Sequence, residues 1–305
     1  MHFKISNLLV LTQKECRIMA IDRWQIDLQM MSLIQIDSCG VEAGHPFIQM
    51  KNGLRVYSFE PTKKELQKFE ELGENLPAGL KPECMRAARD IVQRYFRENG
   101  FAPTPQKTQF LVPGGAFIDV GAFSGLASIK AAQRVGEQGK VVAIEASRDC
   151  FEILKLNIEA NNIKNVYPFH TAATDSDGEV QLYEGGRQAN TILEKAYDSS
   201  SDKVKTHEKP VAVPARRIDG ILNEIGLSPA MTTTMSLEIN GAEYLALKGA
   251  INFLTACENF YIRSAARFFE NKEMAIESQV RELFSGHSVR FAMIAPYLHI
   301  FKGAI

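Results

Sequence analysis

"FIDVGAFSG", Phe117 to Gly125, is the most informative segment of this chain of 305 residues. An apolar strand pattern runs into Asp119, a turn with Gly121 and Gly125 follows, and a helical pattern comes next. Glycines let the backbone turn tightly and approach a ligand closely. The start of a helix offers unpaired N–H groups to a polar ligand group. The segment therefore predicts a strand, a ligand-binding turn and a helix.

The spacing of the glycines distinguishes two classes of nucleotide site. The pattern here is Asp-x-Gly-x-x-x-Gly, whereas nicotinamide sites carry Gly-x-Gly-x-x-Gly. Glu145 ends the next extended run, 20 residues after Gly125. An acidic side chain at that place can accept hydrogen bonds from both hydroxyls of a ribose. The pattern predicts a nucleoside site and disfavours the alternative of a nicotinamide oxidoreductase.

Extended and helical patterns alternate from this segment onward. The extended runs lie at 116–120, 140–145, 165–172, 232–239 and 259–265, and the helical patterns at 124–135, 148–162, 242–256 and 272–285. Repeated strand–helix units of this kind predict a parallel sheet covered on both faces. Asp219, just before a further short helical pattern, is expected to cap a helix.

Two prolines refine the topology of this sheet. Pro168 cannot donate to a ladder, so its strand is expected at a sheet edge. The last two extended runs, 288–295 and 297–303, are separated by little more than Pro296, and so short a link permits only antiparallel pairing. A mostly parallel sheet that ends in a hairpin resembles class I methyltransferases, which are Rossmann-like, more than dinucleotide dehydrogenases.

Residues 1–110 have a different pattern. An Asn-Gly pair within 47–59 predicts a β-hairpin. Thr62, with Glu65 three residues later, forms a capping box at a helix start. A second helical pattern follows at 81–99 with one apolar face. These patterns predict an N-terminal α+β extension that acts as a substrate cap or a partner region.

The boundary between the two parts is rich in proline, with Pro103, Pro105 and Pro113. We therefore expect an extension over 1–110 and a catalytic domain over 111–305. Hydrophobic residues make up 45% and charged residues 23% of the chain, as in ordinary globular proteins, which excludes a disordered or collagen-like chain.

Charge, apolar run length and cysteine content indicate which partners to expect. The 35 basic residues do not exceed the 36 acidic ones, whereas nucleic-acid binders usually have a basic excess. No apolar run approaches the roughly 20 residues of a membrane span. The five cysteines are few, odd in number and lack zinc-site spacing. We expect no nucleic acid, no membrane and no metal, and a reducing, cytoplasmic location.

The segment from about 114 to 255 resembles the FkbM-type methyltransferases, which use S-adenosyl-L-methionine. Five motifs follow that family in order and spacing: "DVGAFSG", "VVAIEASRDCFEILKLNIEANNIKNV", "TAATDSDGEVQLYEG", "ARRIDGIL" and "LEINGAEYLALKGA". The resemblance implies a class I methyltransferase fold, with a mostly parallel seven-stranded sheet and a terminal antiparallel hairpin. It also implies S-adenosyl-L-methionine as the cofactor.

The resemblance also implies roles for individual residues. The cofactor loop around the methionine part corresponds to Asp119, Gly121, Ala122, Phe123 and Gly125. The ribose ligand corresponds to Glu145, with Ala146 and Ser147 beside it, and the adenine pocket to Thr171 and Ala172. Glu238 stands at the family's usual Asp and Asn240 at its usual Glu, while Glu243 matches directly.

The implied reaction is O-methylation of a hydroxyl on a small molecule or saccharide. Glu238 is the candidate that accepts the proton of this hydroxyl, and His170 is a second candidate base. The family commonly has Lys-Ile-Asp-Val-Glu-Gly where this chain has Ser-Leu-Glu-Ile-Asn-Gly, at 236–241. This difference motivates an alternative, a catalytically degenerate methyltransferase fold that serves as a binding or interaction module.

Overall fold

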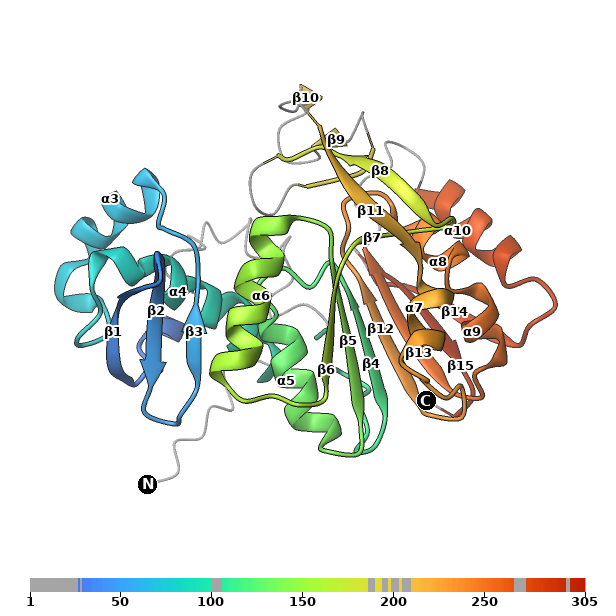
Figure 1. The fold of residues 1–305 in the computed structure, drawn as a ribbon, viewed down its shortest axis with the longest axis horizontal. Coiled ribbons are helices and arrows are strands. Elements are labelled where there is room, and N and C mark those ends of the chain that lie inside the picture. Colours follow the sequence, from blue (N-terminus) through green and yellow to red (C-terminus); the bar gives the residue numbers. More distant parts are fainter. Residues whose placement is uncertain are drawn as a thin grey trace. The chain divides into compact units, whose positions relative to one another are not determined.

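The computed structural model describes residues 27, 29–99, 106–185, 190–193, 197–198, 203–204, 210–265, 273–294 and 297–304. The chain forms two compact units, Met1–Gln109 and Phe110–Ile305 (Figure 1). Pro103, Pro105, Pro296 and one of the five cysteines, Cys16, lie outside the described residues. Within the described part of the chain, no helix is long and apolar enough to cross a membrane.

The N-terminal unit contains a three-stranded antiparallel sheet. Its strands are β1 (Ile36–Glu42), β2 (His45–Met50) and β3 (Arg55–Tyr57), in the order β1-β2-β3. The N–H of Gly53 donates to the carbonyl of Met50 in the turn between β2 and β3. The hairpin predicted within 47–59 is therefore confirmed.

Helices complete this unit. The helix α3 (Lys63–Leu72) begins with the predicted capping box, in which the Thr62 side chain and the Glu65 backbone and side chain bond reciprocally. The pattern at 81–99 is helical but not one regular α-helix. It comprises a 3₁₀ turn at Pro82–Cys84, α4 (Met85–Asp90), a π-helical segment at Ile91–Phe96 and a 3₁₀ turn at Arg97–Asn99.

The larger unit is built on a seven-stranded sheet. In spatial order the strands are β14 (Val289–Ile294), β15 (Tyr297–Lys302), β13 (Phe260–Ala265), β12 (Thr233–Leu237), β4 (Ala116–Val120), β5 (Lys140–Glu145) and β6 (Val166–His170). The five strands from β13 to β6 pair in parallel, and β15 pairs antiparallel with both β13 and β14. The predicted sheet, its terminal hairpin and the edge position of Pro168 are confirmed.

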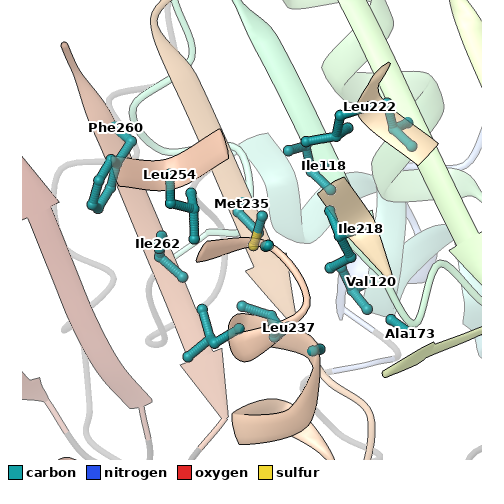
Figure 2. Packing of buried hydrophobic residues seen from close by; sticks show 14 of the residues in the cluster. Ile118, Val120, Ala173, Ile218, Leu222, Met235, Leu237, Leu254, Phe260 and Ile262 are labelled. Carbon is teal, nitrogen blue, oxygen red and sulfur yellow. The ribbon is translucent and has the colours of Figure 1, made fainter. Parts of the chain in front are cut away.

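Helices cover both faces of this sheet (Figure 1). They are α5 (Leu126–Val135), α6 (Arg148–Ala160), α7 (Ile218–Glu224), α8 (Glu243–Lys248), α9 (Ile251–Ala256) and α10 (Glu273–Leu283). Alternate side chains of each strand face opposite layers. Phe117 and its neighbours pack against α5 and α6, whereas Ile118 packs against the layer of α7, α8 and α9, where Figure 2 shows it beside Leu222.

A second, smaller sheet follows β6. The sequence patterns did not predict this separate sheet. It contains β7 (Ala172–Thr174), β11 (Val211–Arg217) and β8 (Gly178–Leu182), in the order β7-β11-β8. The extended run at 165–172 is thus divided between two sheets. The division falls at Thr171, whose hydroxyl donates to the carbonyl of Pro214 at 2.9 Å. Two further short strands, β9 (Tyr197–Asp198) and β10 (Lys203–Val204), pair antiparallel.

The single helix predicted at 242–256 is wrong, because the chain forms two helices that meet at Gly249 and Ala250. A Cβ added at Gly249 would lie 2.0 Å from the carbonyl oxygen of Thr174 in β7, so only glycine fits this close approach. The prediction that Asp219 caps the helix at its own position is wrong, because α7 has Arg217 at its N-cap and no side-chain cap bond; Asp219 instead bonds to the start of α9. Its carboxylate accepts the N–H of Phe253 at 2.9 Å and of Asn252 at 3.3 Å.

Candidate active site

The turn between β4 and α5 is held against the end of β5. The N–H groups of Gly121 and Ala122 both donate to the carbonyl of Ile144, at 2.9 and 3.0 Å. Gly121 has a φ of +82°, and a Cβ added there would lie 2.4 Å from the carbonyl oxygen of Glu238. Only glycine meets both conditions. The turn therefore joins the ends of three strands, β4, β5 and β12.

Glu145 organises the two turns that follow β4 and β5. Its Oε2 accepts the N–H of Phe123 at 2.8 Å, and its Oε1 accepts the N–H of Ser147 at 2.9 Å. The residue is buried. A carboxylate has about four lone-pair positions, so its oxygens can accept hydrogen bonds from hydroxyl groups of a ligand as well as from backbone N–H groups. The position of Glu145 fits the predicted ribose ligand, and this role stays a prediction.

Asp119 has a different environment from Glu145. It is fully buried in β4, and its Oδ2 accepts the hydroxyl proton of Ser128 in α5 at 2.7 Å. This bond ties the helix to the strand. Asp119 therefore fixes the position of α5 relative to β4 on the two sides of the turn. Direct contact of Asp119 with a cofactor stays a prediction.

The end of β6 adds a ring and two buried residues beside Glu145. His170 stacks on Phe151 with ring centroids 5.1 Å apart, and its Nε2 donates to the carbonyl of Ala146 at 3.1 Å, because a carbonyl can only accept. The N–H of Thr171 donates to the carbonyl of Glu145. Thr171 and Ala172 are both buried, so their assignment to an adenine pocket remains a prediction.

Glu238 follows β12 at the same edge of the sheet as the turn after β4. Its N–H donates to the carbonyl of Val120 at 3.0 Å. Its Oε1 accepts hydrogen bonds from Nη1 of Arg263 at 2.7 Å and from the hydroxyl of Tyr297 at 3.1 Å. The guanidinium carbon of Arg263 lies 3.5 Å from the centroid of the Tyr297 ring. The candidate base is therefore part of an ion pair with an aromatic partner.

Arg263 and Tyr297 were not recognised as site residues from the sequence. Their partner Glu238 is 25 and 59 residues away along the chain, so no local motif links the three. One signal was present. Arg263 lies within "FYIRSA", a strand in which every residue is buried, and arginine is almost never fully buried unless it is paired.

Asn240 and Glu243 shape the turn after Glu238. Asn240 has a φ of +55°, its Nδ2 donates to the carbonyl of Asn190, and its own carbonyl accepts the hydroxyl of Thr191. The two oxygens of Glu243 accept the N–H groups of Ile239 and Gly241, at 3.0 and 2.8 Å. Both side chains therefore bond to backbone groups, Asn240 to that of Asn190 and Glu243 to those of Ile239 and Gly241.

Burial raises the pKa of the Glu243 carboxyl to about 7, although the two backbone N–H groups act in the opposite direction. In the folded chain the Glu243 carboxyl therefore keeps a proton that it releases at about pH 4.3 in the unfolded chain. We expect the free energy of unfolding to fall by about 3 kcal/mol as the pH rises through this interval, and then to level off.

The measurement is urea unfolding of the wild type and of Glu243→Gln at about pH 5 and about pH 8. Because glutamine does not ionise, the stability of the wild type relative to the variant is expected to decrease from the lower to the higher pH. An equal difference at both values would contradict the raised pKa.

Among the described residues, no group of three or more His, Cys, Asp or Glu side chains is placed to hold a metal ion. The cysteines within this part of the chain, Cys39, Cys84, Cys150 and Cys257, are free and buried. The candidate site residues Glu145, Glu238 and Arg263 carry charged groups of the kind that bind hydroxyl and charged groups of an organic ligand.

Comparison with known proteins identifies the family of this chain. The family model of the methyltransferase FkbM domain matches residues 119–291, more than half of the chain. The probable cobalt-precorrin-6B C(15)-methyltransferase (decarboxylating) of Sulfurisphaera tokodaii is 33% identical over 146 residues, which cover 46% of this chain and 71% of that protein. The corresponding protein of Sulfolobus acidocaldarius is 40% identical over 53 residues, 17% of this chain and 28% of that protein.

Among solved structures, methyltransferase FkbM from Methylobacillus flagellatus KT matches with a TM-score of 0.44 and 14% identity. The match covers 78% of this chain and 59% of that protein, so the chain spans about three fifths of the length of this relative. The match of the family model extends from Asp119 in β4 to Phe291 in β14, a strand of the terminal hairpin. The chain belongs to the FkbM family of S-adenosylmethionine-dependent methyltransferases.

Proposed function

We propose that this protein transfers the methyl group of S-adenosyl-L-methionine to a hydroxyl oxygen of a small molecule or saccharide. The observation that carries the proposal is Glu145, a buried carboxylate that joins the turns after β4 and β5 through Phe123 and Ser147. It offers hydroxyl-accepting oxygens where two parallel strands end, the usual ligand site of an open α/β sheet.

The residues present fit the cofactor. Glu145 would accept the ribose hydroxyls, and the turn from Gly121 to Gly125 would lie along the methionine part. The ring of His170, stacked on Phe151, would flank the nucleoside. The cofactor, when bound, supplies a methyl group on a positively charged sulfur, and the carbon of this methyl group is the electrophile.

Glu238 is the residue that we assign to the acceptor hydroxyl. It follows the strand next to β4, and 26% of its side chain is exposed. Arg263 and Tyr297 hold its Oε1 in one place. A carboxylate fixed in this way orients a hydroxyl and accepts its proton as the oxygen is alkylated, and orientation of the reacting atoms contributes strongly to such rates.

Glu238→Gln is expected to lower turnover about tenfold, less than a full loss of base catalysis, because the amide oxygen still accepts a hydrogen bond. Affinity for S-adenosylhomocysteine should change little. Calorimetry gives the affinity, and methyl transfer to a panel of sugars, lipids and polyketides gives turnover. Glu179→Gln, an exposed glutamate of β8, is the control. Turnover equal to that of the wild type would remove Glu238 from this role.

The second candidate function is a binding or interaction module on the same fold. It is favoured by the altered motif at 236–241, in which Asn240 bonds to the segment at 190–193. Bound cofactor without a methylated product from any hydroxyl acceptor would favour this module. A product methylated at carbon would contradict O-methylation. It would match the reaction in the name of the relative from Sulfurisphaera tokodaii, a C(15)-methyltransferase. The N-terminal unit would supply the substrate cap or the partner contact.

A further inference from the structure

Three neighbouring strands place a row of polar side chains on one face of the sheet. Ser236 of β12 pairs with Arg263 of β13, and Arg263 pairs with His299 of β15. All three residues are buried. The interior of a sheet normally excludes such groups unless each is hydrogen-bonded.

Arg263 uses only part of its hydrogen-bonding capacity. Its Nη1 donates to Glu238 at 2.7 Å and lies 3.4 Å from the hydroxyl of Ser236. Neither Nε nor Nη2 has an acceptor among the described residues, although the side chain is 0% exposed. A buried charged donor without an acceptor is costly, so these two groups require an explanation.

The geometry of the guanidinium indicates what is missing. Nε–H and one N–H of Nη2 point in the same direction along one edge of the planar group. Two parallel donors of this kind match the two oxygens of a carboxylate or phosphate. His299 in the same row has a buried Nε2 that also lacks a partner among the described residues. Its Nδ1 is bonded to the hydroxyl of Tyr261 at 2.7 Å.

We propose that the Nε–Nη2 edge of Arg263 binds a carboxylate group of the methyl acceptor. This inference rests on the proposed function, since it names the class of acceptor for the same site. A carboxylate suits the site better than a phosphate, because Glu238 already bonds to the same guanidinium and would repel a dianion more strongly than a monoanion.

The position of Glu238 assigns the carboxylate to the acceptor. Arg263 bonds to Glu238 through Nη1 and keeps its other edge for the ligand, so one side chain would position both the candidate base and the substrate. Glu238 is the exposed member of the pair, with 26% of its side chain accessible against 0% for Arg263. A ligand would therefore enter past Glu238. The methionine tail of the cofactor also carries a carboxylate, and the experiment separates the two sources.

The test measures the thermal stability of the full chain with acetate and with acetamide, its neutral counterpart, at constant ionic strength. Acetate is expected to raise Tm and acetamide is not. Arg263→Lys keeps the charge beside Glu238 but removes the paired donors, so we expect acetate affinity to fall about tenfold or more. Arg148→Lys, an exposed arginine, is the control and should behave as the wild type.

Equal effects of acetate and acetamide on the wild type would overturn the inference, and this comparison holds even where the Arg263 variant fails to fold. An unchanged acetate affinity in a folded Arg263→Lys would also overturn it. Acetate that still binds in saturating S-adenosylhomocysteine supports a carboxylate on the acceptor. Acetate that is displaced by S-adenosylhomocysteine, but not by 5′-methylthioadenosine, would assign the edge to the cofactor and overturn the assignment to the acceptor.

The same series separates this inference from the proposed function. S-adenosylhomocysteine that stabilises the protein while acetate does not would leave the proposed function standing and remove the carboxylate site. Acetate that binds while S-adenosylhomocysteine does not would remove the cofactor site and leave the carboxylate site. If both acetate and S-adenosylhomocysteine bind, hydroxy acids are expected to be methylated faster than their amides. This preference should be lost in Arg263→Lys.

Discussion

Glu145→Ala is expected to weaken the binding of S-adenosylhomocysteine at least a hundredfold. The substitution removes a buried carboxylate that would accept hydrogen bonds from the two ribose hydroxyls. Each hydrogen bond to a charged group contributes about 1.5–3 kcal/mol. It also releases the N–H groups of Phe123 and Ser147, which this carboxylate holds in place. Isothermal titration calorimetry measures the affinity directly.

Two controls keep this result interpretable. Glu152→Ala removes an exposed glutamate of α6 that pairs with Arg148, and its affinity should equal that of the wild type. Urea unfolding without ligand shows whether the variant remains folded at the temperature of the titration. A folded Glu145→Ala with the affinity of the wild type would show that this residue does not bind the ribose.

Gly121→Ala is expected to destabilise the protein by about 4 kcal/mol and to abolish cofactor binding. A φ of +82° costs an alanine about 1–2 kcal/mol. The added Cβ would in addition lie 2.4 Å from the carbonyl oxygen of Glu238, and the main chain there cannot rotate away as a side-chain end can. Overpacking of this kind costs about 1–3 kcal/mol or more. The urea midpoint and calorimetric binding report the two effects.

Gly136→Ala is the matched control for this prediction. Gly136 has a φ of +71°, and an added Cβ would have nothing within 4 Å. With a ψ of −176° Gly136 lies in a region that is essentially restricted to glycine, so the variant isolates the conformational cost, which we expect to be about 1–3 kcal/mol without loss of binding. Equal destabilisation by the two substitutions would mean that the turn after β4 can move away from Glu238, contrary to the close contact described above.

Elements with strong local periodicity could be predicted from the sequence. β4, β5 and β13 are short apolar runs between turn signals, and their burial follows from composition alone. The capping box of α3 and the edge position of Pro168 also follow from local chemistry, since one depends on side chains three residues apart and the other on a missing N–H. Local signals of this kind do not depend on the rest of the fold.

The predictions that were wrong involve contacts between distant segments. The apolar pattern at 242–256 is continuous, yet the helix is interrupted where Gly249 meets the carbonyl of Thr174, 75 residues earlier. The extended run at 165–172 contains no turn signal after Pro168, yet the chain passes at Thr171, which bonds to Pro214, into a second sheet. Helix and strand propensities carry no information about either contact.

The candidate site shows the same division. The turn after β4 and Glu145 could be located because each follows directly from a strand and a turn in sequence. The pairing of Glu238 with Arg263 and Tyr297 could not be predicted, because it depends on β12, β13 and β15 being neighbours in the sheet. The register of these strands brings together residues that no motif connects.

The order of the strands also has a consequence for association between molecules. One edge of the seven-stranded sheet is β6, where Pro168 interrupts the row of N–H groups that another strand would need for pairing. The other edge is β14, with Met293 39% and Ile294 52% exposed and no proline within the strand. Aggregation by strand addition, where the protein is stressed, is therefore expected to begin at β14.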